Sequence, residues 1–161
     1  TRKISRKIIY HHGPTNSGKT SAALEALKLA KKGVYMAPLR LLAWQTQQKL
    51  LPCSLITGQE KQIVNSGLTS CTIETVDLGG EYDVAVIDEI QLLADPERGW
   101  AWTQALLAVK ADVIHLCGES RALELVSKLV AATGDTLEER KYSRFSKLHL
   151  LNQFYSIEED L

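Results

Sequence analysis

The chain has 161 residues, of which 45% are hydrophobic and 24% charged, and its 19 basic and 19 acidic side chains give a formal net charge of zero. These values are typical of one globular domain with a real core, and they lack the excess of basic residues that marks autonomous nucleic-acid-binding domains. No apolar run approaches the roughly 20 residues that a membrane-spanning helix needs, and no signal peptide is recognised, so we expect no contact with a membrane.

Short apolar runs alternate with helical patterns along the chain. In chain order, the patterns predict a strand at 8–11, a helix at 21–32 ended by Gly33, a strand at 34–37, a helix at 39–51 closed by Pro52, weaker strands at 54–56 and 71–73, a strand at 82–87, a helix at 99–110, a strand at 113–117, a helix at 121–133 ended by Gly134, and last strands at 136–141 and 147–151. Such alternation is typical of an α/β domain with a mainly parallel sheet and helices on both faces. Ligands of these sheets bind at the carboxyl ends of the strands.

The cysteines and the paired histidines give no sign of a metal site. Cys53, Cys71 and Cys117 are far apart, and no Cys-x-x-Cys pair occurs. We therefore expect buried, reduced thiols rather than a disulfide framework or a zinc site. His11 and His12 are neighbours, but successive residues of a strand point to opposite faces, so we expect no shared metal site there.

Residues 13–20 read GPTNSGKT and directly follow the first predicted strand. This is the pattern of a phosphate-binding loop, whose glycines let backbone N–H groups turn toward a triphosphate and whose following helix adds its positive N-terminal end. Lys19 is expected to reach the outer phosphates, and the Thr20 hydroxyl is expected to ligate Mg²⁺. The predicted nucleotide-binding set is Gly13, Pro14, Thr15, Asn16, Ser17, Gly18, Lys19 and Thr20.

A second motif follows the strand predicted at 82–87, where Asp88 and Glu89 stand at the carboxyl end. Taken alone, the pair also fits a solvated acidic turn. Beside a phosphate loop, Asp88 is predicted to hold Mg²⁺ through water, and Glu89 to orient or deprotonate the attacking water. Gln91 is predicted to hydrogen-bond the γ-phosphate, which makes Lys19, Glu89 and Gln91 the candidate catalytic residues. The pair favours hydrolysis over kinase chemistry, which must exclude water.

Several segments together resemble a known family. GPTNSGKT, APLRLLA, TG, SCTIET, VIDEIQ and LCGES occur in the order typical of the first RecA-like domain of superfamily-two DExH/D-box helicases. DEIQ, RGWAWT and LCGE together resemble one branch, the suppressor-of-Var type of ATP-dependent RNA helicase of the mitochondrial degradosome, which also has bacterial relatives. The resemblance extends from residue 8 to about residue 151. It implies a RecA-like P-loop NTPase domain over residues 1–151, with residues 152–161 starting a linker to a second RecA-like domain.

The resemblance also implies contacts with nucleic acid. Pro38 and Arg40 match a segment that contacts the nucleic-acid backbone. Thr57-Gly58 and Thr72 match further backbone-tracking segments, whose N–H and hydroxyl groups suit phosphates without reading sequence. The segment that couples the ATP state to strand separation matches Gly118, Glu119 and Ser120.

These assignments have structural alternatives. Arg40 also fits a solvated residue at a helix start, Thr57-Gly58 a plain turn, and Gly118 a simple strand-to-loop glycine. Trp100 and Trp102 resemble base-stacking platforms, but the small apolar residues behind them favour packing within the domain.

The function implied by the resemblance is that of an ATP-binding domain in an RNA helicase that couples ATP hydrolysis to unwinding for RNA degradation. ATP and Mg²⁺ are the implied cofactors. RNA or DNA, the second RecA-like domain and a degradosome exoribonuclease are the implied partners, in the mitochondrial matrix of a eukaryote or the cytoplasm of a bacterium. The chain starts at Thr1 rather than Met and stops before the second domain, whose arginines complete the ATP site. We therefore expect a piece of a longer protein that alone binds nucleotide weakly and hydrolyses little or none.

Two other functions stay open at this level. Thymidine kinases of the RecA-like type also pair a phosphate loop with D-E-x-Q, although they carry a zinc-binding Cys-x-x-Cys lasso that this chain lacks. Phosphoryl transfer to thymidine would support that alternative. A non-enzymatic, nucleotide-dependent interaction module is the other, and intact Lys19, Thr20, Asp88 and Glu89 argue against it.

Overall fold

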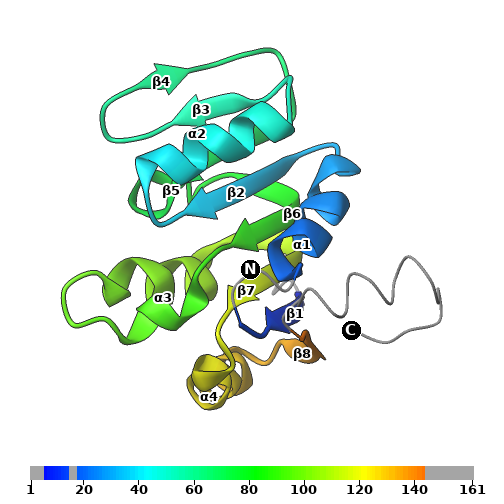
Figure 1. Cartoon of the computed structure of the whole chain (residues 1–161), viewed down its shortest axis with the longest axis vertical. Helices are drawn as coiled ribbons and strands as arrows, with labels where there is room; N and C mark the ends of the chain where they lie inside the picture. The colour runs from blue at the N-terminus through cyan, green and yellow to red at the C-terminus, as the bar shows by residue number, and fades with distance from the viewer. Residues whose placement is uncertain (1–5, 15–17, 144–161) are drawn as a thin grey trace.

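An eight-stranded sheet forms the centre of the molecule. The computed structural model describes residues 6–14 and 18–143, and the strand order is β4-β3-β5-β2-β6-β7-β1-β8 (Figure 1). The strands are β1 (Lys7–His12), β2 (Gly33–Ala37), β3 (Ser54–Ile56), β4 (Lys61–Gln62), β5 (Leu68–Thr72), β6 (Glu81–Ile87), β7 (Lys110–Gly118) and β8 (Thr136–Lys141). The α-helices are α1 (Lys19–Lys28), α2 (Arg40–Lys49), α3 (Gly99–Ala108) and α4 (Leu123–Thr133).

Neighbouring strands run parallel, except for the antiparallel pair β3 and β4. Ala37 at the end of β2 lies opposite Thr72 at the end of β5. Gly118 at the end of β7 lies opposite His12 at the end of β1. The parallel strands therefore finish along one edge of the sheet. We call the residues at and directly after the ends of β1, β2, β3, β5, β6 and β7 the carboxyl edge.

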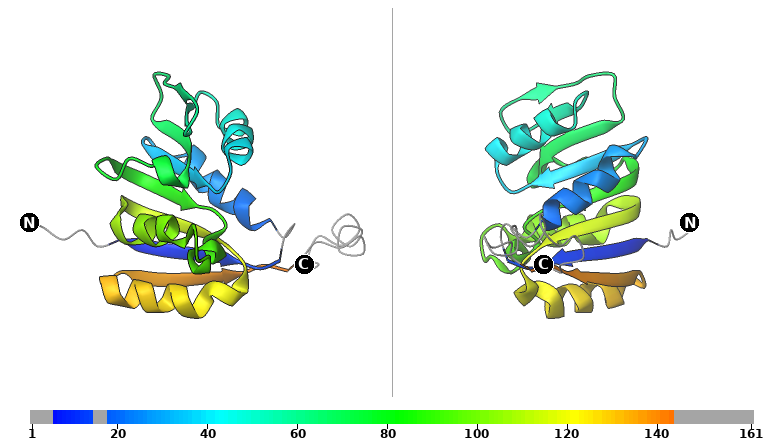
Figure 2. Two further views of the ribbon diagram at one scale, coloured as in Figure 1. Left: turned by 90° about the vertical axis from the view of Figure 1, so that its left-hand side faces the viewer. Right: turned by 45° about the vertical axis from the view of Figure 1, so that its right-hand side comes forward.

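Helices cover both faces of the sheet. On one face, α1 and α2 contribute to a cluster of buried residues that includes Leu27, Tyr35 and Val86. On the opposite face, α3 and α4 contribute to a cluster that includes Met36 and Trp102 (Figure 2). Tyr35 and Met36 are successive residues of β2 and face opposite helix layers, as the period of a strand requires. The predicted α/β architecture, with a mainly parallel sheet between two helix layers, is confirmed.

Most predicted elements are confirmed to within a few residues. β3 and β8 have the predicted bounds. Gly134 ends α4 as predicted, in the left-handed conformation with φ 78°, which glycine adopts without a steric penalty. The strand predicted at 147–151 lies outside the described residues.

The end of the first helix differs from the prediction. α1 ends at Lys28 instead of residue 32, and Gly33 is the first residue of β2 instead of a helix stop. A Cβ atom at position 33 would lie 2.4 Å from Leu27 Cδ1. The glycine therefore leaves room for the Leu27 side chain of α1, a close approach that a local stop signal does not reveal.

Three further differences involve short elements. β5 ends before Ile73, which starts a 3-10 turn (Ile73–Thr75), so the strand predicted at 71–73 is shifted toward the N-terminus. A 3-10 turn (Ser120–Ala122) precedes α4, which therefore begins two residues later than predicted. The sequence does not predict β4, because its two residues are exposed and carry no apolar pattern.

The cysteines are buried as predicted, and the two neighbouring histidines point in opposite directions. All three cysteines are buried and unpaired. His11 Nε2 lies 2.8 Å from His115 Nδ1, whereas His12 Nδ1 lies 2.8 Å from Ser120 Oγ, so the two neighbours face opposite sides. Within residues 6–14 and 18–143, no three His, Cys, Asp or Glu side chains are grouped to hold a metal ion. None of the described helices has the length and apolar character needed to cross a membrane.

Candidate functional site

The predicted site residues gather at the carboxyl edge in two adjacent groups. The phosphate loop, the Asp88–Glu89 pair and the segment at Gly118–Ser120 lie at the ends of the neighbouring strands β1, β6 and β7. We call this group the phosphate-loop half. The predicted nucleic-acid segments lie at the ends of β2, β5 and β3, which are also neighbours. We call that group the Arg40 half.

The phosphate loop connects β1 to α1 across the carboxyl edge. At its start, Gly13 N donates a hydrogen bond to the Gly118 carbonyl oxygen, 3.1 Å away. At its end, Gly18 adopts the left-handed conformation (φ 88°) and leads into the first turn of α1. Glycine reaches this conformation without the clash of a Cβ atom, so the N-terminus of α1 opens toward the loop. Thr15, Asn16 and Ser17 lie outside the described residues.

Lys19 and Thr20 start α1 beside a buried thiol. The Lys19 side chain is buried, and its ammonium donates to the Pro14 carbonyl oxygen at 2.8 Å. The positive charge therefore lies over the loop, where it would meet a phosphate. Thr20 is half-buried next to it, and Cys117 Sγ lies 3.8 Å from the Lys19 carbonyl oxygen. Burial raises the pKa of the Cys117 thiol well above its ordinary value, so the thiol packs under the site as a neutral group.

Asp88 is held by two residues for which the sequence analysis predicts no polar role. The Tyr35 hydroxyl, from β2, donates to Asp88 Oδ2 at 2.5 Å. The Trp102 indole N–H, from α3, donates to the Asp88 main-chain oxygen at 2.9 Å. Both aromatic side chains are fully buried. The signal in the sequence was a tyrosine within a buried apolar strand, because a buried hydroxyl needs a partner.

The environment of Asp88 favours a nearby cation. Burial raises the pKa of Asp88 to about 6, the Tyr35 hydrogen bond opposes that rise, and the Glu89 charge adds to it. At neutral pH the carboxylate is therefore a poorly solvated anion, whose cost a cation would offset. Carboxylate and hydroxyl oxygens are the ligands that Mg²⁺ prefers, so Asp88 and Thr20 fit that ion.

Gln91 joins the end of β6 to the end of β7. Glu89 has φ 53°, the single positive φ of a non-glycine residue in the part of the chain that the structure describes. It precedes a 3-10 turn (Ile90–Ala94) that the sequence analysis does not predict. The Gln91 amide group donates to the Glu89 carboxylate at 2.5 Å, and its carbonyl oxygen accepts from the Glu119 N–H at 3.1 Å. One side chain thus links the predicted catalytic carboxylate to the predicted coupling segment.

Gly118 is required by this close approach. A Cβ atom at position 118 would lie 2.5 Å from Gln91 Oε1 and 3.0 Å from Ile90 N. The alternative of a simple strand-to-loop glycine therefore does not describe it fully. Ser120 Oγ lies 2.8 Å from His12 Nδ1, which attaches the same segment to β1.

The Arg40 half is more open. Arg40 is exposed at the first residue of α2. Thr57 is buried, and its hydroxyl accepts hydrogen bonds from the N–H groups of Gln59 (3.2 Å) and Glu60 (3.1 Å). That hydroxyl therefore builds the turn, as the plain-turn alternative anticipates, and leaves Gly58 exposed at its surface.

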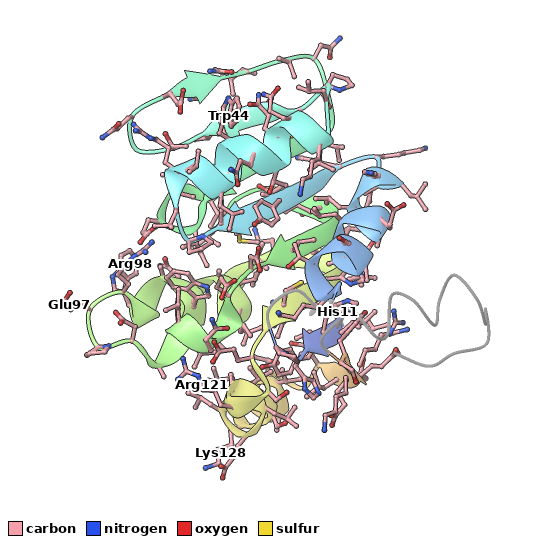
Figure 3. The ribbon with its side chains drawn as sticks, in the orientation of Figure 1. His11, Trp44, Glu97, Arg98, Arg121 and Lys128 are labelled. Atoms are coloured by element: carbon pink, nitrogen blue, oxygen red, sulfur yellow. The ribbon has the colours of Figure 1, made fainter. Side chains whose placement is uncertain are left out.

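The other predicted contacts lie at the ends of β2 and β5. Pro38 is buried, and Thr72 is half-buried with its hydroxyl 3.3 Å from that of Thr75. A shallow pocket lies between α2 and the turn after β3, and the Trp44 side chain of α2 is part of its lining (Figure 3). The structure thus brings the Arg40 and Gly58 segments together, and their contact with nucleic acid stays a prediction. The residues that line the pocket are Arg40, Leu41, Trp44, Gln59 and Glu60.

The two tryptophans of RGWAWT have different environments. Trp102 is fully buried, so the predicted packing within the domain is confirmed for it. Trp100 is 58% exposed, so the same prediction is wrong for Trp100. Residues two positions apart in an α-helix differ by about 200° in direction, so only one of the two tryptophans faces the sheet.

Known proteins match this chain over most of its length. Residues 1–142 match the family model of the DEXQ-box helicase domain of Suv3. The chain is 53% identical over 152 residues to the mitochondrial DExH-box ATP-dependent RNA helicase DExH18 of Arabidopsis thaliana, covering 91% of this chain and 20% of that protein. It is 46% identical over 160 residues to the mitochondrial ATP-dependent RNA helicase SUPV3L1 of Homo sapiens, covering 94% of this chain and 20% of that protein. The chain therefore spans about a fifth of the length of these relatives.

A solved helicase structure shares the fold. The helicase domain of Pyrococcus furiosus Hef aligns with a TM-score of 0.58 at 18% identity, covering 85% of this chain and 35% of that one. At that identity the likeness concerns the fold alone. The predicted RecA-like P-loop fold is confirmed.

Proposed function

This chain belongs to the family of Suv3-type DEXQ-box helicase domains, and from that premise we propose that it is the ATP-binding domain of an ATP-dependent RNA helicase. The observation that carries the proposal is the phosphate-loop half, where Lys19 follows the end of β1, and the Asp88–Glu89 pair and Gln91 follow the end of β6, with β7 between these two strands. The family match leaves the thymidine-kinase alternative without support.

In this proposal, the phosphate loop binds the triphosphate of ATP. The N-terminus of α1 supplies N–H donors and the positive end of its dipole. Lys19 exchanges its bond to the Pro14 carbonyl oxygen for the outer phosphates. The whole set from Gly13 to Thr20 takes part, including the residues outside the described part of the chain.

Thr20 and Asp88 hold Mg²⁺, whose role when bound is to neutralise charge on the phosphates. The Tyr35 hydroxyl and the Trp102 indole fix the two ends of Asp88, so the carboxylate keeps its position. Preorganised groups of this kind cost no rearrangement at the moment of reaction.

Glu89 orients or deprotonates the attacking water, and Gln91 bonds the γ-phosphate. Because Gln91 also accepts from the Glu119 N–H, loss of the phosphate would change the position of the segment Gly118–Ser120. This segment carries the nucleotide state to the rest of the protein. Its movement drives strand separation.

The Arg40 half holds the nucleic-acid backbone. Arg40 makes a charge-assisted contact with a phosphate, and the N–H groups around Gly58 make neutral ones. These contacts carry no base preference, as a motor that moves along RNA requires. The proposed contact set is Pro38, Arg40, Thr57, Gly58 and Thr72.

The remaining parts of the proposal concern the whole protein. Residues 1–151 form the first RecA-like domain, and residues 152–161 start the linker to a second one. The relatives named above are mitochondrial helicases, which supports a mitochondrial location if the source is a eukaryote. For a bacterial source the proposed location is the cytoplasm. RNA, or DNA in its place, is the substrate, and an exoribonuclease is the proposed partner in RNA degradation.

The decisive experiment uses the full-length protein that carries this chain. ATP hydrolysis is measured with Mg²⁺, with and without single-stranded oligouridine RNA, alongside strand separation of an RNA duplex. We expect RNA-stimulated hydrolysis and ATP-dependent unwinding. Phosphoryl transfer to thymidine, or RNA binding with no hydrolysis at all, would contradict the proposal. The same assay on the 161-residue chain alone tests the expectation of weak hydrolysis.

A further inference from the structure

Arg98 joins two segments of the Arg40 half. It lies just before α3, near the end of β2 (Figure 3). One terminal nitrogen of its guanidinium donates to the Pro38 carbonyl oxygen at 2.7 Å and to Glu74 Oε2 at 2.8 Å, and Nε donates to the same Glu74 oxygen at 3.0 Å. Pro38 follows β2, and Glu74 follows β5. A single side chain therefore fixes the spacing of two segments that are proposed to contact RNA.

The same guanidinium contacts Trp102, which in turn contacts the phosphate-loop half. Arg98 Cζ lies 5.1 Å from the centre of the Trp102 ring, within the range of a cation–π contact. The Trp102 indole N–H in turn donates to the Asp88 main-chain oxygen. Asp88 Oδ1 accepts a hydrogen bond from the Glu89 N–H at 2.9 Å, so the contacts continue to Glu89.

The loop that carries Arg98 is itself well defined. The Arg98 N–H donates to Asp95 Oδ2 at 2.8 Å, and Gly99 N donates to the Asp95 carbonyl oxygen at 2.9 Å. These bonds fix the backbone at the start of α3, so the guanidinium is positioned by a rigid element. Displacement of Pro38 or Glu74 would therefore be transmitted to α3 and Trp102 and would not be absorbed by the loop.

We propose that Arg98 is a positioning residue that couples RNA binding at the Arg40 half to the Asp88–Glu89 pair. The inference rests on the proposed function and adds a role for a residue outside the proposed ATP and RNA contact sets. Its contact with Glu74 offsets the positive charge of Arg98, which argues against a direct contact with an RNA phosphate. The planar, always charged guanidinium is suited to two hydrogen-bonded partners and one aromatic ring at once.

The test compares Arg98→Ala with the unmodified full-length protein. The readout is the ratio of the ATP hydrolysis rate with saturating oligouridine RNA to the rate without RNA. We expect this ratio to fall by about tenfold, the size of a typical coupling effect, while the RNA-free kcat and the KM for ATP stay within about twofold. A merely structural role would lower both rates in the same proportion.

Two further variants keep the test decisive if Arg98→Ala does not fold. Arg98→Lys keeps the charge next to Glu74 but loses the fork that also reaches Pro38, so we expect an intermediate ratio. Trp102→Phe keeps an aromatic ring beside Arg98 but removes the N–H that reaches the Asp88 main chain, so we expect a lowered ratio too. A ratio equal to that of the unmodified protein in either folded variant would overturn the proposal.

Arg140→Ala is the matched control. Arg140 donates to Glu138 Oε2 at 2.8 Å and belongs to β8, at the edge of the sheet farthest from the Arg40 half. Its side chain is 48% exposed, compared with 37% for Arg98. We expect the unmodified ratio in this variant.

The outcomes separate this inference from the proposed function. Absence of RNA stimulation in the unmodified protein would remove the proposed function itself. Stimulation that persists in Arg98→Ala would overturn the coupling role alone. A salt dependence of RNA binding that weakens by about one phosphate contact in Arg98→Ala would identify a direct contact with RNA and would likewise overturn it.

Discussion

The two halves of the carboxyl edge differ in how far their predicted functional residues are exposed to solvent. In the phosphate-loop half, Lys19, Asp88 and Gln91 are between 3% and 7% exposed, and each is hydrogen-bonded to a neighbouring segment. In the Arg40 half, Arg40 and Gly58 are exposed, and Trp44 beside them is 46% exposed. Chemistry on a phosphate needs fixed groups shielded from water, whereas binding along a flexible backbone needs donors that face outward.

Trp102 connects the two halves, because it contacts Arg98 on one side and the Asp88 main chain on the other. We expect the largest effect from its replacement. Trp102→Ala should lower the free energy of unfolding by about 4 kcal/mol, because it empties a fully buried aromatic site and frees the Asp88 main-chain oxygen. Chemical denaturation measures the change. Trp100→Ala is the control from the same helix, and its exposed side chain predicts a change within about 0.5 kcal/mol. Equal losses in the two variants would contradict the packing described here.

The second prediction concerns the chemistry of the phosphate-loop half. Glu89→Gln should lower kcat for ATP hydrolysis by about a hundredfold or more, because an amide cannot accept the proton of the attacking water. Glutamine preserves the shape of the side chain, so we expect nucleotide binding to persist. Steady-state hydrolysis and fluorescent-nucleotide binding measure the two properties. Glu97→Gln, on an exposed residue of the loop before α3, should leave both unchanged, and a similar loss there would point to a general charge effect.

The third prediction uses the histidines behind the phosphate loop. Burial lowers the pKa of His11 and of His115 to about 4, and His11 Nδ1 also lies 2.7 Å from the Tyr142 hydroxyl. The unfolded chain takes up these protons near pH 6.5, whereas the folded chain does not until about pH 4. The contribution of the two neutral histidines to the free energy of unfolding is therefore fully present above pH 6.5. It decreases as the pH falls toward 4, by at most about 1.4 kcal/mol per pH unit for each histidine.

Urea unfolding over this pH range measures that slope. His115→Gln removes one titrating group, so we expect a shallower pH dependence than in the unmodified protein, whatever the absolute loss of stability. If the slope in His115→Gln equals or exceeds that of the unmodified protein, His115 titrates in the folded protein as it does in the unfolded chain, which would contradict the prediction.

The smallest expected effect concerns the Arg40 half. Arg40→Ala should weaken RNA binding about fivefold, uniformly across sequences, and should reduce the salt dependence by about one phosphate contact. Fluorescence anisotropy at several salt concentrations measures both quantities. Lys49→Ala, at the other end of α2, is the control and should bind as the unmodified protein does. Sequence-dependent loss in Arg40→Ala would indicate contact with bases and would contradict backbone binding.

Local sequence was sufficient to predict most of the helices and strands. The apolar run of β3 and the glycine after α4 are local patterns, so β3 and the end at Gly134 were predicted correctly. The bounds of β8 were also predicted correctly, although its residues are exposed or half-buried. Gly33 was predicted to end a helix, but it starts β2. Its close approach to Leu27 depends on how α1 packs against the sheet, which the local sequence does not reveal. The environment of Trp100 was likewise missed, since exposure depends on which side of α3 meets the sheet.

By itself, the sequence determined which groups are candidates for the chemistry, because a phosphate-loop pattern and a strand ending in two carboxylates are local arrangements of specific residue types. Only the tertiary structure decided how these groups are held. The strand order places β6 between β7 and β2, so Asp88 receives a hydroxyl from Tyr35 and its main chain receives an indole N–H from Trp102. The contacts of Arg98 with Pro38 and Glu74 join residues far apart in the chain, and such contacts follow from packing geometry rather than from local pattern.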